Sequence, residues 1–125
     1  MDMKGLEGEM LLVRIFVKES DHFDGRPLYL ALLEVLQDAG IRGGTALRGI
    51  AGFGAHTQMH TDRILRLSHD LPVVVEAVDE EDRIRAILPR LDDMIGSGLI
   101  TFEKANVIRY VHPSQGNSGP GGAGG

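Results

Sequence analysis

Residues 71–100, LPVVVEAVDEEDRIRAILPRLDDMIGSGLI, contain one complete strand–helix–strand unit. The first eight residues are rich in valine and predict a strand, the strongest strand signal in the chain. A helix follows, with Asp79 as its predicted N-cap and Gly96 as its predicted end. Its apolar residues recur at helical spacing: Ile84, Leu88, Leu91 and Ile95. Pro89 is expected to kink this helix.

The first half of the chain repeats the same order of elements. Residues 10–18, MLLVRIFVK, predict a strand, and a helix then runs from Pro27 to a left-handed stop at Gly40. Residues 45–54 predict a weaker strand broken by glycines, and residues 99–111 predict a last strand, bent or bulged near Lys104 and Ala105. Two successive βαβ units of about forty residues predict an α+β fold. We therefore expect a ferredoxin-like βαββαβ plait, a four-stranded antiparallel sheet with two helices on one face.

Both faces of this predicted sheet carry apolar side chains. On the first strand Val13 and Ile15 share one face, whereas Leu12 and Phe16 share the other, because strand residues alternate. The valines of the third strand divide in the same way. A monomer would leave the helix-free face as an exposed apolar patch, so we predict a homo-oligomer that buries it.

Composition limits the possible classes of function. The 125 residues suit one domain, expected over residues 8–114, followed by a disordered glycine-rich tail over residues 115–125. The formal net charge of −5 argues against nonspecific binding to nucleic acid, and no apolar run is long enough to be membrane-embedded. The absence of cysteine excludes thiol chemistry and disulfides. The start of the chain does not resemble a signal peptide, so we expect a cytoplasmic protein.

The sequence offers little support for catalysis. Ser68, His69 and Asp70 are consecutive, and neighbours along a strand point to opposite faces, so they cannot act as a relay. We therefore predict that the protein is not an enzyme and needs no cofactor. His56 and His60 could chelate a cation if their segment were helical, but only Asp62 or His69 stands near enough in sequence to add a third ligand, and no metal site is predicted.

The stretch most suggestive of a ligand site is residues 48–56, RGIAGFGAH. Its three glycines remove side chains where a strand gives way to a loop, which lets backbone N–H groups approach a phosphate. A strand-end bulge is the structural alternative. A second glycine pair flanks Ser97, and the segment after Gly54 is longer than an ordinary hairpin loop.

These residues, in this order, resemble the PII signalling superfamily, and more specifically its uncharacterised PII-like branch, a domain of unknown function related to nitrogen-regulatory PII and CutA proteins. The resemblance rests on residues 48–54 (RGIAGFG), 67–74 (LSHDLPVV), 95–101 (IGSGLIT) and 107–110 (VIRY). It implies a homotrimer with inward-facing sheets and an adenine nucleotide in each cleft between subunits. It also implies that the 55–70 loop engages a membrane transporter or an enzyme that the protein regulates.

Carried over residue by residue, the resemblance predicts a nucleotide site in which the first glycine group forms the loop base, the second forms the phosphate-side turn, and a strand arginine binds the anion. Its members are Arg48, Gly49, Gly52, Phe53, Gly54, His56, Gly96, Ser97, Gly98 and Arg109. A guanidinium suits this task because its fork meets two phosphate oxygens.

The chain departs from the PII pattern at three positions. Ala55-His56 stands where PII has a glutamine soon after its Gly-Phe-Gly, Leu99 stands where PII has a lysine, and Val111 stands where PII has a second arginine. Each charge-assisted contact is worth about 1.5–3 kcal/mol, so AMP or ADP is a better expected ligand than ATP. The alternative is a CutA-like trimer that binds a divalent metal, or a purely structural trimer without nucleotide.

Overall fold

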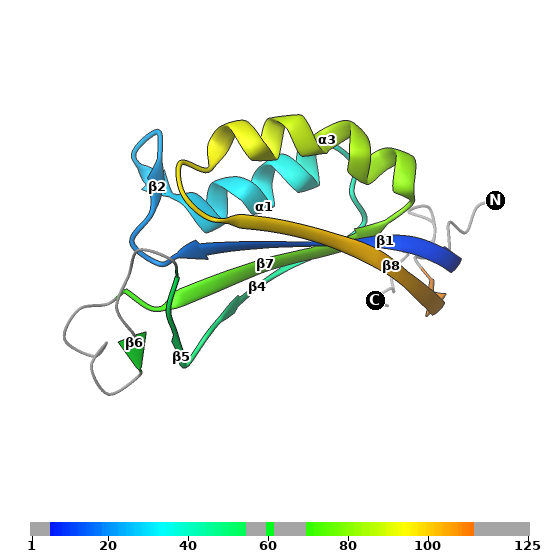
Figure 1. The fold of residues 1–125 in the computed structure, drawn as a ribbon. Helices are drawn as coiled ribbons and strands as arrows, with labels where there is room; N and C mark the ends of the chain where they lie inside the picture. The colour runs from blue at the N-terminus through cyan, green and yellow to red at the C-terminus, as the bar shows by residue number, and fades with distance from the viewer. Residues whose placement is uncertain (1–5, 55–59, 62–69, 112–125) are drawn as a thin grey trace, which may run out of the picture.

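The computed structural model describes residues 6–54, 60–61 and 70–111. Its main sheet has four strands in the order β4 (Gly44–Arg48), β7 (Pro72–Asp79), β1 (Leu6–Lys18) and β8 (Leu99–Tyr110). Every neighbouring pair is antiparallel. Both helices, α1 (Leu28–Asp38) and α3 (Glu81–Met94), cover one face, and no described helix covers the other (Figure 1). The predicted α+β, ferredoxin-like plait is confirmed.

The hydrophobic core lies between the helices and one face of the sheet. Val13, Ile15 and Val75 are completely buried beneath Leu32 of α1 and Ile84 of α3. The alternation along β1 and β7 produces this layer, because every second residue faces the helices. Gly40, with φ of 85°, ends α1 in the left-handed conformation that the sequence predicts there.

Two short hairpins lie outside the four-stranded sheet. β2 (His22–Phe23) and β3 (Arg26–Pro27) pair before α1, and β5 (Ala51–Gly52) pairs with β6 (His60–Thr61). The first hairpin was not predicted, although Asp24-Gly25 at its tip, with φ of 53° and 76°, is a recognised turn signal. The predicted strand over residues 45–54 instead divides into β4 and β5, which belong to different sheets.

Two local predictions are wrong. The N-cap of α3 is Glu80 and not Asp79. The fully buried carboxylate of Asp79 instead accepts hydrogen bonds from the backbone N–H groups of Arg42 (2.9 Å) and Glu80 (2.7 Å). The irregularity of β8 also lies elsewhere than Lys104 and Ala105, since the register with β1 shifts between its pairs Gly8–Val107 and Leu6–Tyr110. Pro89 lies inside an uninterrupted α3.

The helix-free face is apolar around an ionic centre. Arg14 of β1 donates through Nε to Glu76 of β7 at 2.9 Å, and its Nη1 lies 3.5 Å from Glu103 of β8. Hydrogen bonding to Glu76 raises the pKa of the Arg14 guanidinium above its ordinary value. Large apolar side chains on this face remain exposed: Phe16, Leu47 and Leu99. The two-faced pattern predicted from the sequence is present in the fold.

Candidate functional site

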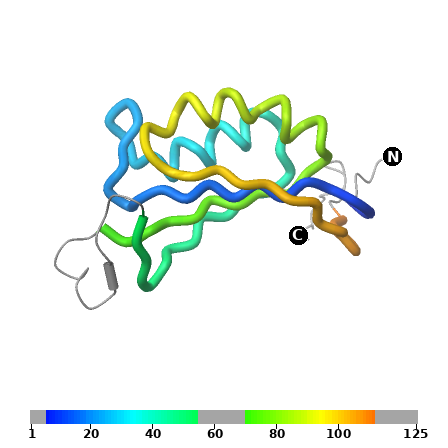
Figure 2. Tube along the Cα trace, viewed as in Figure 1, coloured from blue at the N-terminus to red at the C-terminus, as the bar shows by residue number. Residues whose placement is uncertain are grey.

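The two glycine groups of the predicted site lie at the same end of the sheet. Leu99, which follows the second group, pairs with Phe16 near the end of β1. Leu47, just before the first group, pairs with Val74, and Val74 in turn pairs with Phe16. Figure 2 shows this end opposite the one where β1 begins and β8 ends. The fold therefore places these two turns, more than forty residues apart in sequence, at the same end of the sheet but on its two outer strands.

The first glycine group packs against Pro72 at the start of β7. A Cβ atom added to Gly49 would lie 2.9 Å from Pro72 Cγ, and one added to Gly52 would lie 3.0 Å from it. The Gly49 N–H also donates to the Pro72 carbonyl at 2.7 Å. These two glycines are thus required by close packing of the chain itself. Beside them Ile50 and Phe53 are strongly exposed, at 78% and 73%.

The second glycine group contains two different kinds of glycine. A Cβ atom added to Gly98 would lie only 2.6 Å from the backbone oxygen of Phe16, so a side chain does not fit there. At Gly96 an added Cβ would meet nothing within 4 Å among the described residues, and its φ lies outside the left-handed region. Neither the packing nor the backbone conformation of the described chain therefore explains Gly96, which leaves its exposed backbone open to a ligand.

Residues 19 and 20 hold the chain on both sides of the segment between β4 and β7. Glu19 accepts a hydrogen bond from Arg48 Nη2, and its own N–H donates to the Leu71 carbonyl at 2.8 Å. Ser20 Oγ donates to Asp70 Oδ1 at 2.7 Å. Arg48 is therefore already paired with a carboxylate, and the described acidic groups leave no surplus positive charge at this end.

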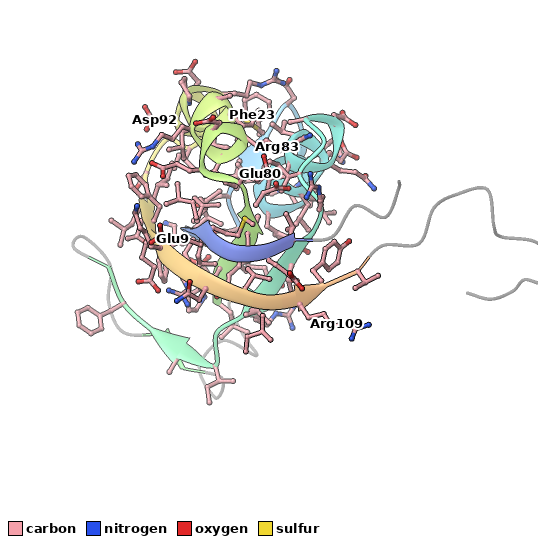
Figure 3. The ribbon with its side chains drawn as sticks, turned by 90° about the vertical axis from the view of Figure 1, so that its right-hand side faces the viewer. Glu9, Phe23, Glu80, Arg83, Asp92 and Arg109 are labelled. Atoms are coloured by element: carbon pink, nitrogen blue, oxygen red, sulfur yellow. The ribbon has the colours of Figure 1, made fainter. Side chains whose placement is uncertain are left out.

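Arg109 lies at the opposite end of its protomer. Arg109 is ten positions after Leu99 in β8, which corresponds to about 30 Å at the rise of a β-strand. Figure 3 shows its side chain pointing away from the helices. Arg109 and the glycine turns of one chain cannot contact the same small ligand, so a shared site requires Arg109 from another copy.

Some predicted residues fall where the structure gives no side-chain description. His56 and most of the 55–70 loop lie outside the described residues, and His60 is placed in β6 without its side chain. Within the described part of the chain, no three His, Asp or Glu side chains are grouped closely enough to hold a metal ion. Likewise, none of the described helices is long and apolar enough to cross a membrane.

Sequence reasoning missed Glu19 and Ser20 as parts of this end of the molecule. The sequence places them in a polar cluster directly after the first strand, which predicts a turn but not its partners. Their partners Arg48 and Asp70 are 29 and 50 residues away, and the sequence alone does not reveal those contacts.

Comparison with known proteins agrees with this geometry. A family model named DUF190, described as "Uncharacterized ACR", matches residues 10–107. The chain belongs to the DUF190 family. Among curated relatives of this DUF190 protein, a UPF0166 protein of Aquifex aeolicus (strain VF5) is 40% identical over 97 residues, covering 78% of this chain and 91% of the relative. A UPF0166 protein of Methanocaldococcus jannaschii is 36% identical over 99 residues, with coverage of 78% and 91%.

Solved structures with the same fold include CPII, a nitrogen regulatory PII-like protein from Thiomonas intermedia K12 bound to ADP, AMP and bicarbonate. That structure superimposes with a TM-score of 0.59 at 15% identity, covering 86% of this chain and 99% of CPII. A second CPII structure with the same ligands gives 0.56 at 17% identity, covering 83% and 91%. At these identities the likeness establishes the shared fold, and the resemblance to an uncharacterised PII-like branch is confirmed.

Proposed function

We propose that this DUF190 protein is a cytoplasmic, non-enzymatic PII-like regulator that binds AMP or ADP between the subunits of a homotrimer. The observation that carries the proposal is the arrangement of the two glycine groups at one end of the sheet, where none of the described residues constrains Gly96. An open, exposed glycine beside a tight turn lets backbone N–H groups approach a phosphate. The CPII structures, which hold ADP and AMP on the same fold, support this choice of ligand.

The helix-free face supports the assembly. Phe16, Leu47 and Leu99 are 37–55% exposed and lie in one row across the sheet, next to the Arg14 ion pair. A soluble monomer rarely leaves so contiguous an apolar surface uncovered. At its far end this face is also hollowed by about 400 Å³ between Leu12, Val78 and Val107, among other residues. We expect other copies of the chain to cover it.

The positions of the glycine turns and of Arg109 favour a closed ring. The turns lie at one end of the four-stranded sheet, and Arg109 lies at the other end. Copies arranged head to tail around an axis that crosses the strands would place the Arg109 end of one sheet next to the glycine-turn end of another. Such a heterologous arrangement forms a ring when the rotation closes. It would also supply the partner whose Arg109 can reach the glycine turns.

The proposed ligand follows from the available charge. The described cation beside the first glycine group, Arg48, is paired with Glu19, and Leu99 follows the second group where PII has a lysine. Arg109 of a neighbouring copy would then be the main phosphate partner. A single guanidinium suits a mono- or diphosphate better than a triphosphate. We further propose that the 55–70 loop, whose neighbouring strands flank this site, contacts the membrane transporter or enzyme that is regulated.

A thermal-shift panel tests the proposal. AMP, ADP, ATP, cyclic AMP and divalent cations are added separately, and light scattering reports the assembly. A ligand present at a hundred times its Kd stabilises the native state by about 2.7 kcal/mol. We expect a shift with AMP or ADP that Arg109→Ala abolishes, in a particle of three chains. A 13.6 kDa monomer without nucleotide shifts would contradict the proposal, and a shift with cations alone would favour the metal-binding alternative.

A further inference from the structure

Glu19 places a negative charge beside the first glycine group, where a site for an anion would be expected to have positive charge. Its side chain is only 20% exposed, whereas that of its partner Arg48 is 60% exposed. The Glu19 backbone is fixed by its N–H bond to the Leu71 carbonyl. The carboxylate is therefore a fixed part of this end of the sheet, and the arginine is the more accessible member of the pair.

The pair lies directly at the first glycine group. Arg48 is the last residue of β4, and the next residue, Gly49, is hydrogen-bonded to Pro72 and packed against it. Only one nitrogen of the Arg48 fork, Nη2, bonds to Glu19. A guanidinium carries five N–H donors, so Arg48 retains donors for a second anion while its charge is balanced by Glu19.

We propose that Glu19 is a specificity-determining residue that limits the number of phosphates the site accepts. This inference rests on the proposed function. Glu19 holds Arg48 beside the glycine turn and also cancels its charge, so the site can donate hydrogen bonds to a phosphate without a large excess of positive charge. Each further phosphate adds negative charge close to the Glu19 carboxylate. The resulting repulsion disfavours ATP more than AMP.

The substitution Glu19→Gln separates the two roles. Glutamine keeps an oxygen that can accept from Arg48 Nη2, and it removes the negative charge. Two additional ligand charges about 8 Å from the lost carboxylate, in water-like dielectric, correspond to a change of about fivefold in relative affinity. We expect the ratio of ATP affinity to AMP affinity, measured without magnesium by calorimetry, to rise by about this factor. The rise should diminish at high salt because exposed charges are screened.

Glu34→Gln is the matched control. Glu34 on α1 is paired with Arg26 through two hydrogen bonds of 2.5 and 2.7 Å, so the variant makes the same change in net charge at another ion pair. Its ATP-to-AMP ratio should equal that of the wild type. An equal rise in both variants would show a general effect of net charge and would overturn the proposal.

The outcomes distinguish this inference from the proposed function. If the wild type binds AMP and Glu19→Gln leaves the affinity ratio unchanged, the role of Glu19 is refuted and the nucleotide site stands. If the wild type binds no nucleotide, both fail. Should Glu19→Gln not fold, Arg48→Ala provides the test: it leaves Glu19 without its partner, so the ratio should fall below that of the wild type. An unchanged ratio in that variant would refute the inference.

Discussion

Adding one methyl group at Gly98 or at Gly96 should have opposite consequences for stability and binding. In Gly98→Ala the new Cβ would lie 2.6 Å from the backbone oxygen of Phe16. That oxygen belongs to β1, which is paired on both sides, with β7 and with β8, so it cannot move away without disturbing the sheet. In Gly96→Ala the new Cβ would meet no described atom within 4 Å.

The expected magnitudes follow from these distances. Overpacking costs about 1–3 kcal/mol, and the contact with rigid backbone places Gly98→Ala toward the upper part of this range. For a domain of this size, each kcal/mol lowers the Tm by about 4 °C, so we expect a decrease of about 8–12 °C. Gly96→Ala should change stability by less than about 1 kcal/mol, and it can be stabilising because alanine restricts the unfolded chain. Its effect should appear instead as weaker AMP or ADP binding.

Thermal denaturation at equal protein concentrations and calorimetric titration with AMP measure the two effects separately. A Gly98→Ala protein as stable as the wild type would refute the packing argument for this turn. A Gly96→Ala protein that binds AMP as tightly as the wild type would refute the assignment of Gly96 to the ligand site. Gly43→Ala serves as a control for the packing effect, since an added Cβ there also meets no described atom within 4 Å.

Three further variants test other parts of the fold. Phe16→Asp on the helix-free face should dissociate the assembly, as measured by light scattering. Leu30→Asp on α1, where the side chain is similarly exposed, should leave the assembly intact. A Phe16→Asp protein that remains a trimer would contradict burial of this face. Asp79→Ala should lower the free energy of unfolding, measured by urea titration, by about 2–4 kcal/mol, because it leaves two backbone N–H groups without their buried acceptor. Asp82→Ala, at an exposed side chain, should change the free energy of unfolding little. Hydrogen bonds from Arg26 and Arg85 lower the pKa of Glu34 and Glu81, so carboxyl NMR should show both titrating below ordinary glutamates. Any stabilisation is present above pH 4.5 and is lost as the pH falls through the lowered values. Arg85→Ala should move only the pKa of Glu81 toward its ordinary value, and an unchanged titration would contradict the ion pair.

The strength of local patterns determined how much of the fold was predictable. The valine-rich β7 and the apolar alternation of β1 identify the sheet and both of its faces, because side-chain period and burial are local properties. Gly40 likewise identifies the end of α1. Asp79 was misassigned because its hydrogen-bond partner, Arg42, is 37 residues away in sequence, whereas capping rules consider only neighbouring residues.

The candidate site was predictable only as a group of residues. The glycine motifs lie at one end of the sheet, but their separate roles depend on tertiary contacts. Gly49 and Gly98 are explained by Pro72 and by the Phe16 backbone, whereas no contact within the described part of the chain explains Gly96. The distance of Arg109 from these turns also emerges only when the length and register of β8 are known.

A subunit-mixing experiment tests the central claim, that each nucleotide site is shared between two copies. Arg109→Ala and Gly96→Asp are each expected to abolish AMP binding in separate preparations. After the two proteins are unfolded and refolded together, random mixing should pair an intact glycine turn with an intact Arg109 at about one quarter of the sites of a closed ring. Recovery of AMP binding to that extent is the predicted result. If wild-type trimers bind AMP and the mixed trimers bind none, both residues act within one chain and the account is contradicted.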